Sequence, residues 1–199
     1  MSLGNKLAKG VIIKGLTAKR NGVLDTLLTT TGVAGGDLGE TSDGVVQASY
    51  SFERNLFSSN VVTVFMDRNG NHPITVLPYR PGAINTCTPT GTEVLSGPFT
   101  GCFMALYRVN GGELKCGHID TSEADNAKPS KDRWETMANK NVLAEGKSTV
   151  SDALFKDMAK TGKGANGGFC LGLATLNPAK VRFFRVVYHG DDLKVTGED

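Results

Sequence analysis

The residue types best suited to chemistry lie together in one stretch, SGPFTGCFMALYRVNGGELKCGHIDT, residues 96–121. There Cys102 follows a glycine-containing loop and opens an apolar run, and His118 lies on the next run. An imidazole that takes the proton of a thiol produces a thiolate nucleophile. Gly97 and Gly101 allow backbone N–H groups to turn toward one point, as an oxyanion hole requires. The stretch therefore predicts an acyl-transfer site with Cys102 as nucleophile and His118 as base.

The pairing of the two apolar runs decides whether these side chains meet. If residues 110–112 form a three-residue turn, Met104 lies opposite His118. Cys102 then lies opposite Asp120, diagonal to His118 and on the same face of the sheet. Diagonal partners are about 7–8 Å apart, within reach for a histidine turned toward a thiol. A two-residue turn puts His118 on the wrong face, and the hydrophobic pattern favours the first register.

Gly101-Cys102 before an apolar strand, with His118 on the following strand, resembles the cysteine deamidases. This group includes the catalytic domain of cytotoxic necrotizing factor, Burkholderia lethal factor and the bacterial chemoreceptor deamidases. Their signature is Leu-Ser-Gly-Cys before an apolar strand, with a histidine one short hairpin later. The matching residues here are Phe99-Thr100-Gly101-Cys102, in which Thr100 replaces the serine and Phe99 the leucine. The resemblance covers this stretch and the general strand-rich organisation.

The resemblance implies a β-sandwich core, deamidation of glutamine in a protein substrate, and no metal or organic cofactor. In that reaction Cys102 attacks the side-chain carboxamide, and His118 helps ammonia leave and then activates water. Backbone N–H groups of Gly101 and Cys102 hold the oxyanion. Family members orient the histidine with a backbone carbonyl or use an upstream hydroxyl, which makes Ser96 and Thr100 the candidates for the hydroxyl.

The function expected from these residues is that of a cysteine-dependent glutamine deamidase, a hydrolase acting as a bacterial toxin or virulence effector on a host protein. A protease or amidase using the same Cys-His dyad is the alternative within enzymes. From a different class, the chain is a β-rich binding domain without enzymatic activity, whose cysteines serve only to pack the core.

Neighbouring residues offer competing interpretations of the same stretch. Cys116 shares a strand face with His118 and is a rival nucleophile, but its mid-strand position indicates a core residue. A zinc site from Cys102, Cys116 and His118 lacks a fourth ligand and the usual paired spacing, so no metal is expected. Asp120 is expected at the rim of the site as a neighbour of His118.

The four cysteines indicate reduced thiols, because none forms a C-x-x-C pair and the chain is long enough to fold without disulfides. Two disulfides stay open as an alternative. Cys170 lies in an apolar run typical of a buried strand, and Cys87 in NTCTPT is expected in a loop.

Composition and length are those of one globular domain, residues 1–199, in which residues 1–44 are a loop-rich N-terminal segment. The net charge of +2 argues against a nucleic-acid partner. No apolar run is long enough to cross a bilayer, and no classical signal peptide is present. We expect a monomer that is either an effector reaching the host cytosol by another export route or a protein of the bacterial cytoplasm.

The periodicity predicts an α+β fold, with a mixed or antiparallel β-sandwich-like core and flanking helices. Turn signals at Asn69-Gly70 and at 110–112 each predict a hairpin, and two further strands flank Asn177-Pro178. One helix is expected after Pro129, with a stripe that reaches Val142, and a second over 148–162. The predicted strands are 45–52, 61–66, 74–77, 102–109, 113–119, 169–176 and 181–188. The final DDLKVTGED is expected to be a solvated tail.

Overall fold

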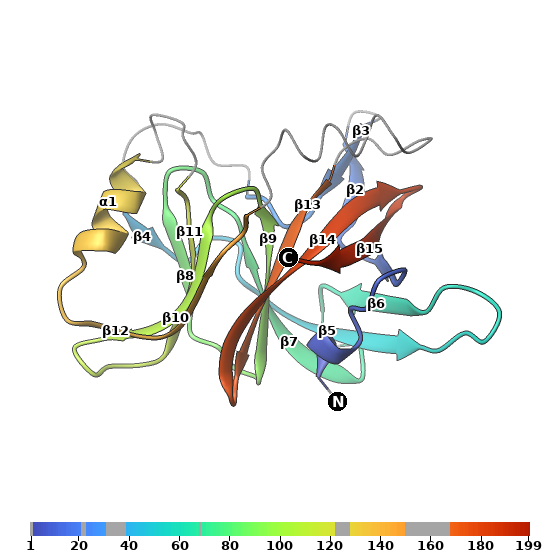
Figure 1. The fold of residues 1–199 in the computed structure, drawn as a ribbon, viewed down its shortest axis with the longest axis horizontal. Coiled ribbons are helices and arrows are strands. Elements are labelled where there is room, and N and C mark those ends of the chain that lie inside the picture. Colours follow the sequence, from blue (N-terminus) through green and yellow to red (C-terminus); the bar gives the residue numbers. More distant parts are fainter. Residues whose placement is uncertain (1, 21–22, 31–38, 68, 122–127, 150–167) are drawn as a thin grey trace.

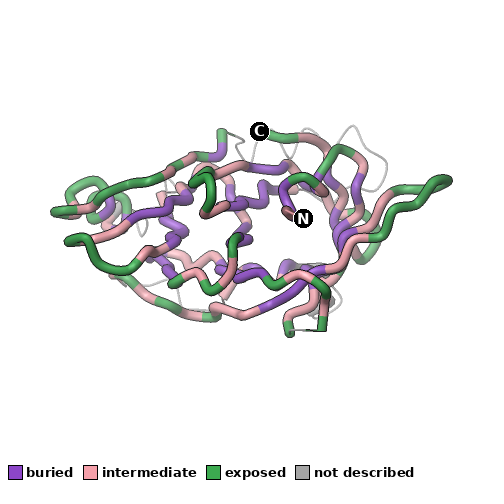
Figure 2. The backbone as a smooth tube through the Cα atoms, turned by 90° about the horizontal axis from the view of Figure 1, so that it is seen from below, coloured by how far each residue is buried: buried purple, intermediate pink, exposed green. Residues whose placement is uncertain are grey.

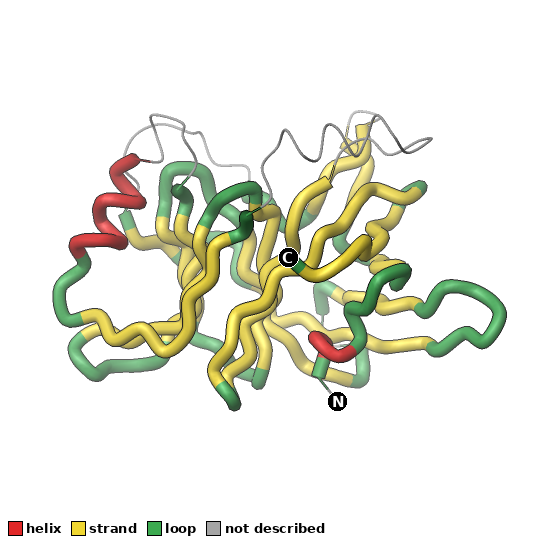
Figure 3. The backbone as a smooth tube through the Cα atoms, viewed as in Figure 1, coloured by secondary structure: helices red, strands yellow, loops and turns green. Residues whose placement is uncertain are grey.

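The computed structural model describes residues 2–20, 23–30, 39–67, 69–121, 128–149 and 168–199. Strands dominate these ranges, as the yellow segments of Figure 3 show. The elements are η1 (Leu3–Asn5), β1 (Ile12–Lys14), β2 (Thr17–Arg20), β3 (Val23–Thr26), β4 (Glu40–Thr41), β5 (Val46–Glu53), β6 (Val61–Phe65), β7 (His72–Pro78), β8 (Ile84–Cys87), β9 (Glu93–Phe99), β10 (Phe103–Val109), β11 (Lys115–Ile119), α1 (Lys128–Thr136), β12 (Lys140–Lys147), β13 (Gly168–Leu176), β14 (Ala179–His189) and β15 (Asp192–Glu198).

Eight strands close into a barrel in the order β1-β15-β14-β13-β9-β7-β5-β6. Parallel pairing of β1 with β6 completes the ring. Inward-facing apolar side chains from these strands form one core cluster, and Leu3 and Leu7 from the N-terminal segment join it. Closure leaves no unpaired strand edge around the ring, which is how small β-proteins protect their backbone hydrogen bonds.

A second sheet, in the order β12-β10-β11-β8-β4, lies beside the barrel, with α1 against its far side (Figure 1). Side chains alternate along β10, so Met104 and Leu106 face the barrel. Ala105 and Tyr107 face the opposite way and pack with Trp134 of α1. Figure 2 shows the buried residues between these layers and the exposed ones at the loops. Strand β10 is therefore covered on both faces.

The α+β expectation is wrong, because the described chain is mainly strand, with a closed barrel instead of a sandwich flanked by helices. The helix at Trp134 exists but ends at Thr136. Val142 lies in β12, which pairs with β10. The second predicted helix, 148–162, lies almost wholly outside the described residues. Pairing between distant strands, which local periodicity does not encode, decided the architecture.

The segments expected to be loops also pair. The C-terminal run forms β15, which joins β14 to β1 in the barrel. Within residues 1–44, β1 belongs to the barrel and β4 to the second sheet, so this segment is not merely loop-rich. Cys87 ends β8 and is buried, contrary to the expected loop position. Each of these strands has at least one partner that is far away in sequence.

One of the two predicted hairpins is confirmed, because β10 pairs antiparallel with β11. The strands that flank Asn177-Pro178, β13 and β14, also pair antiparallel. The hairpin predicted at Asn69-Gly70 is wrong, because β6 and β7 pair with opposite edges of β5 rather than with each other. Among the described residues, no helix is long and apolar enough to cross a membrane.

Candidate active site at His118 and Cys102

The hairpin register brings the predicted pair to one face of the second sheet. Met104 lies opposite His118, as the three-residue turn predicted. Cys102 immediately precedes β10, and its Sγ donates to Oδ1 of Asp120 at 3.6 Å. Cys102 and Met104 belong to the same buried cluster, on the side that faces the barrel. The site therefore lies between the two sheets.

The barrel supplies the group that orients His118. Ser96 on β9 lies with its Oγ 2.9 Å from Nδ1 of His118. The same hydroxyl donates its proton to the backbone carbonyl of Leu77 at 2.5 Å. Because a hydroxyl has one proton, Ser96 must accept from the ring, so Nδ1 carries the hydrogen. Nε2 is then the basic nitrogen of the neutral ring.

Aromatic rings enclose the imidazole. Phe99 stacks on His118 with ring centroids 3.8 Å apart and planes at 7°, and Tyr79 packs at 5.0 Å and 42°. Burial lowers the pKa of His118 from 6.5 to about 3, although the negative charge of Asp120 acts in the opposite direction. The ring is therefore neutral at neutral pH. Its Nε2 has no hydrogen-bond partner within the part of the chain that the structure describes.

Asp120 is a buried hub, not the rim residue that the sequence suggested. Only 1% of its surface is exposed. One carboxylate oxygen accepts from the Tyr79 hydroxyl at 3.0 Å and from the Gly82 N–H at 2.7 Å. Its backbone carbonyl accepts from Ser130 of α1 at 2.5 Å. Asp120 thus fixes the end of β11 and holds the Cys102 thiol.

The loop before the thiol opens outward at Gly101. Its φ of +114° lies in the region that favours glycine, and no atom lies within 4 Å of where a Cβ would stand. Thr121 donates to the Gly101 carbonyl at 2.9 Å and the Ser148 N–H to the Cys102 carbonyl at 3.4 Å. Thr100 is half-buried in this loop, whereas the hydroxyl that contacts the histidine belongs to Ser96.

A position just after a glycine-containing loop suggests an accessible thiol, but Cys102 is buried in this structure, with only 3% of the residue exposed. Phe99 and Met104 lie in the same buried cluster and cover the region on the barrel side. The sequence could not show this, since β9 and β13 of the barrel close over the hairpin from distant parts of the chain. A substrate can therefore reach the sulfur only after a local opening of the structure around it.

The other three cysteines are free and buried, which was expected of Cys116 and Cys170 but not of Cys87. Cys116 lies directly opposite Cys87 on β8. Burial, followed by the contact with Cys87, raises the pKa of Cys116 well above its usual value. Burial also raises the pKa of Cys170 to about 11. Neither is prepared to form a thiolate. Among the described residues, no group of three or more His, Cys, Asp and Glu could hold a metal ion.

The structure places Cys102, His118 and Ser96, which were named from the sequence, in one region. The sequence did not indicate the contacts that Tyr79 and Asp120 make there. Asp120 lies only two residues after His118 in the sequence, which was a signal that the two residues are close in space. Tyr79, from the end of β7, carries no motif that points to the site.

Comparison of the chain with protein-family models, with curated proteins and with solved structures found no match. The resemblance to the cysteine deamidases therefore stays a prediction from the short stretch that carries it.

Proposed function

We propose that this chain is a cysteine-dependent hydrolase of side-chain carboxamides, with glutamine in a protein as its substrate. The observation that supports the proposal most is the tautomer of His118. Ser96 holds Nδ1–H, which leaves a neutral Nε2 without a partner among the described residues. A general base oriented through its other nitrogen is the arrangement that thiol and hydroxyl nucleophiles use.

In this structure the Cys102 thiol donates to Asp120, so the reaction begins with a local rearrangement that releases the thiol and lets its proton pass to Nε2 of His118, which is unpartnered among the described residues. The sulfur attacks the carboxamide carbon to form a tetrahedral oxyanion, which backbone N–H groups near Gly101 and Cys102 stabilise. The C–N bond breaks as Nε2–H protonates the departing nitrogen, and ammonia leaves a thioester. Water then gives a proton to Nε2 and attacks the thioester; the C–S bond breaks, and the thiolate recovers that proton. The products are glutamate and ammonia.

The choice of glutamine over a peptide bond rests on the resemblance to the cysteine deamidases. A toxin or effector role acting on a host protein belongs to the same proposal. The chemistry at Cys102 and His118 is the same for a glutamine side chain and for a peptide bond. One experiment can therefore distinguish deamidation from chain cleavage by the products.

The test is incubation of the protein with a eukaryotic cell extract, followed by peptide mass spectrometry. We expect sites where glutamine has become glutamate, absent with Cys102→Ser and retained with Cys116→Ser, which changes a buried thiol of the same cluster. New chain ends instead of acidified glutamines would identify a protease. Identical peptides from the wild-type protein and Cys102→Ser would contradict the proposal.

The burial of Cys102 favours a second candidate, a β-rich binding domain in which Cys102, Asp120 and Tyr79 form a structural network. In that case Cys102→Ser lowers the free energy of unfolding but changes no chemistry. The extract experiment distinguishes the two, because a binding domain leaves every peptide unmodified.

A further inference from the structure

The loop between β5 and β6 carries the two most exposed large apolar side chains of the described residues. Leu56 is 81% exposed and Phe57 is 101% exposed. The antiparallel pairing ends at Glu53 and Val61, so residues 54–60 extend beyond it. Figures 1 and 2 show this loop projecting from one end of the molecule, at the opposite end from α1. Solvent exposure of a leucine and a phenylalanine together indicates an interaction site.

Polar contacts give the loop a defined shape. The Asn55 N–H donates to Oδ1 of Asn60 at 3.0 Å, and the Asn55 side-chain amide donates to the Ser59 carbonyl at 3.1 Å. The Ile12 N–H donates to the Asn60 carbonyl at 3.0 Å, which ties the loop base to β1. These contacts hold the apolar tip outward. Its insertion into a binding partner therefore costs little additional conformational entropy.

Cationic side chains lie behind the tip. Arg54 and Lys9 are exposed, and the Lys6 ammonium lies 4.1 Å from the ring centroid of Phe52 on β5. Glu53 is an exposed acid of the same hairpin end. Glu198 near Lys9 is paired with Arg182, so basic groups outnumber acidic ones there. An apolar tip backed by Lys and Arg matches the interface of a bilayer that contains anionic lipids.

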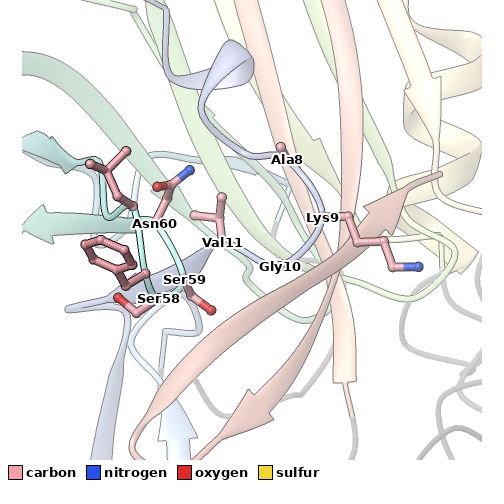
Figure 4. A pocket seen from close by; sticks show the side chains of 9 residues that line it. Ala8, Lys9, Gly10, Val11, Ser58, Ser59 and Asn60 are labelled. Carbon is pink, nitrogen blue, oxygen red and sulfur yellow. The ribbon is translucent and has the colours of Figure 1, made fainter.

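A pocket of about 420 Å³ opens between this loop and the segment 8–11. Figure 4 shows Ser58, Ser59 and Asn60 on one side and Ala8, Lys9 and Gly10 on the other. Hydroxyl and backbone groups at its rim suit a phosphate-bearing headgroup, whereas the Lys9 side chain points away from Ser58, Ser59 and Asn60 in Figure 4. The pocket lies beside the side chains that would enter the acyl region.

We propose that the 54–60 loop attaches the protein to the surface of a membrane containing anionic phospholipids. Leu56 and Phe57 enter the boundary between headgroups and acyl chains, while Lys9 and Arg54 contact phosphates. A protein partner is the less suitable occupant, because a stable protein interface buries about 1,200 Å² or more and one narrow loop offers only part of that area. The proposal does not depend on the chemistry at Cys102.

The experiment is flotation of the full chain with vesicles of phosphatidylcholine, with or without phosphatidylserine. We expect association with the mixed vesicles and much less with pure phosphatidylcholine. The variant Leu56→Ser/Phe57→Ser should lose about tenfold or more in affinity, because two apolar side chains no longer leave water. The matched control is Val142→Ser/Leu143→Ser, which changes the other exposed apolar pair, on β12, and should bind as the wild type does.

Charge removal tests the second half of the proposal. Lys9→Gln and Arg54→Gln should each weaken binding to phosphatidylserine vesicles by about fivefold. Added salt should reduce that difference, whereas inorganic phosphate at equal ionic strength should not compete beyond the salt effect if the source is the membrane. Competition by phosphate alone would assign the pocket to a free anion instead.

Three results would overturn the proposal. The first is that the wild-type protein does not float with mixed vesicles. The second is that the wild type and Leu56→Ser/Phe57→Ser float equally. The third is that the wild type self-associates in sedimentation and only this variant abolishes the association. The last would make the tip an interface between copies of the chain. Both substituted side chains are exposed, so the variants should fold, and their thermal unfolding curves verify this.

Discussion

At the scale of single residues, the protonation of His118 results from opposing influences. Removal from water favours the neutral ring, and the nearby charge of Asp120 favours the cation; burial prevails, with a pKa of about 3. Ser96 then selects the tautomer, because its own proton is used on Leu77. A ring with a pKa of about 3 is a weak base, so it can accept the thiol proton only when an opened site readmits water and restores its basicity.

The depressed pKa of His118 predicts an acid-sensitive fold. In the unfolded chain the ring titrates near 6.5, so between pH 6.5 and about 3 the unfolded state binds more protons. Stability from this residue is complete above pH 6.5 and falls, as pH decreases, by up to about 1.4 kcal/mol per unit. Urea unfolding at pH 7 and pH 5 measures the slope.

His118→Asn is the control for that measurement, because the asparagine amide can still donate toward Ser96 but does not titrate. Its free energy of unfolding should depend less on pH than that of the wild type. Equal slopes for the two proteins would show that His118 does not titrate with a depressed pKa. Proton NMR of the wild-type imidazole gives the same answer if the variant is too unstable.

Ser96→Ala tests the orientation of the ring. The change leaves Nδ1–H without its acceptor in a buried site, which costs about 1–3 kcal/mol of stability. The kcat of deamidation should fall while KM changes less, because a displaced base slows the chemical step after the substrate has bound. The pH profile of kcat should also shift. Thr100→Ala is the control and should leave the pH profile unchanged. A decrease in stability with an unaltered pH profile would make Ser96 purely structural.

At the scale of elements, close approach of β13 to the second sheet keeps the site packed. A Cβ on Gly172 would lie 2.6 Å from Cε2 of Phe99 and 2.7 Å from Sδ of Met104. Phe99 in turn stacks on His118. The absence of a side chain at Gly172 therefore allows the ring sandwich around the histidine.

Gly172→Ala should destabilise the protein by about 1–3 kcal/mol, because overpacking forces Phe99 or Met104 out of position. Thermal unfolding measures the loss. Gly91→Ala is the matched control, since the nearest atom to its added Cβ is 3.6 Å away, an ordinary contact. Equal melting temperatures for the two variants would contradict the packing assigned to Gly172.

Elements formed by local signals were predictable, and those formed by distant pairing were not. The turn at 110–112 set the register that brought Cys102 and His118 to one face. Ser96 could be named because it precedes the nucleophile in the same stretch. Val142 of β12 also fits the helical stripe of Trp134, Met137 and Ala138, and only the pairing of β12 with β10 distinguishes strand from helix there. Burial of Cys102 depends on barrel strands that no local pattern places over it.

At the scale of the whole molecule, a buried carboxylate holds the N-terminal segment against the barrel. Glu93 accepts from the Ser2 hydroxyl at 2.7 Å and from the N–H groups of Leu3 and Gly4 at 2.9 and 3.4 Å. Leu3 and Leu7 then fill the barrel core, which leaves Lys9 beside the 54–60 loop. The N-terminal segment thereby links barrel packing to the proposed membrane surface.

Glu93→Ala should lower the free energy of unfolding by about 2–3 kcal/mol, because backbone N–H groups lose a charged acceptor. Urea unfolding measures the loss. Proteases should also cleave the segment N-terminal to Lys9 faster in the variant than in the wild type. Glu113→Ala removes an exposed carboxylate and should change stability by less than about 0.5 kcal/mol. Equal effects of the two substitutions would refute the anchoring role of Glu93.

The most direct test of the Cys102–His118 pair is the rate at which iodoacetamide modifies each cysteine of the folded protein. With a base at Nε2 and a local opening of the structure around the sulfur, Cys102 should be alkylated faster than Cys87, Cys116 and Cys170, and more slowly in His118→Asn. Mass spectrometry of peptides assigns each rate. Four equally unreactive thiols, or a Cys102 rate that His118→Asn leaves unchanged, would contradict the catalytic role of the pair.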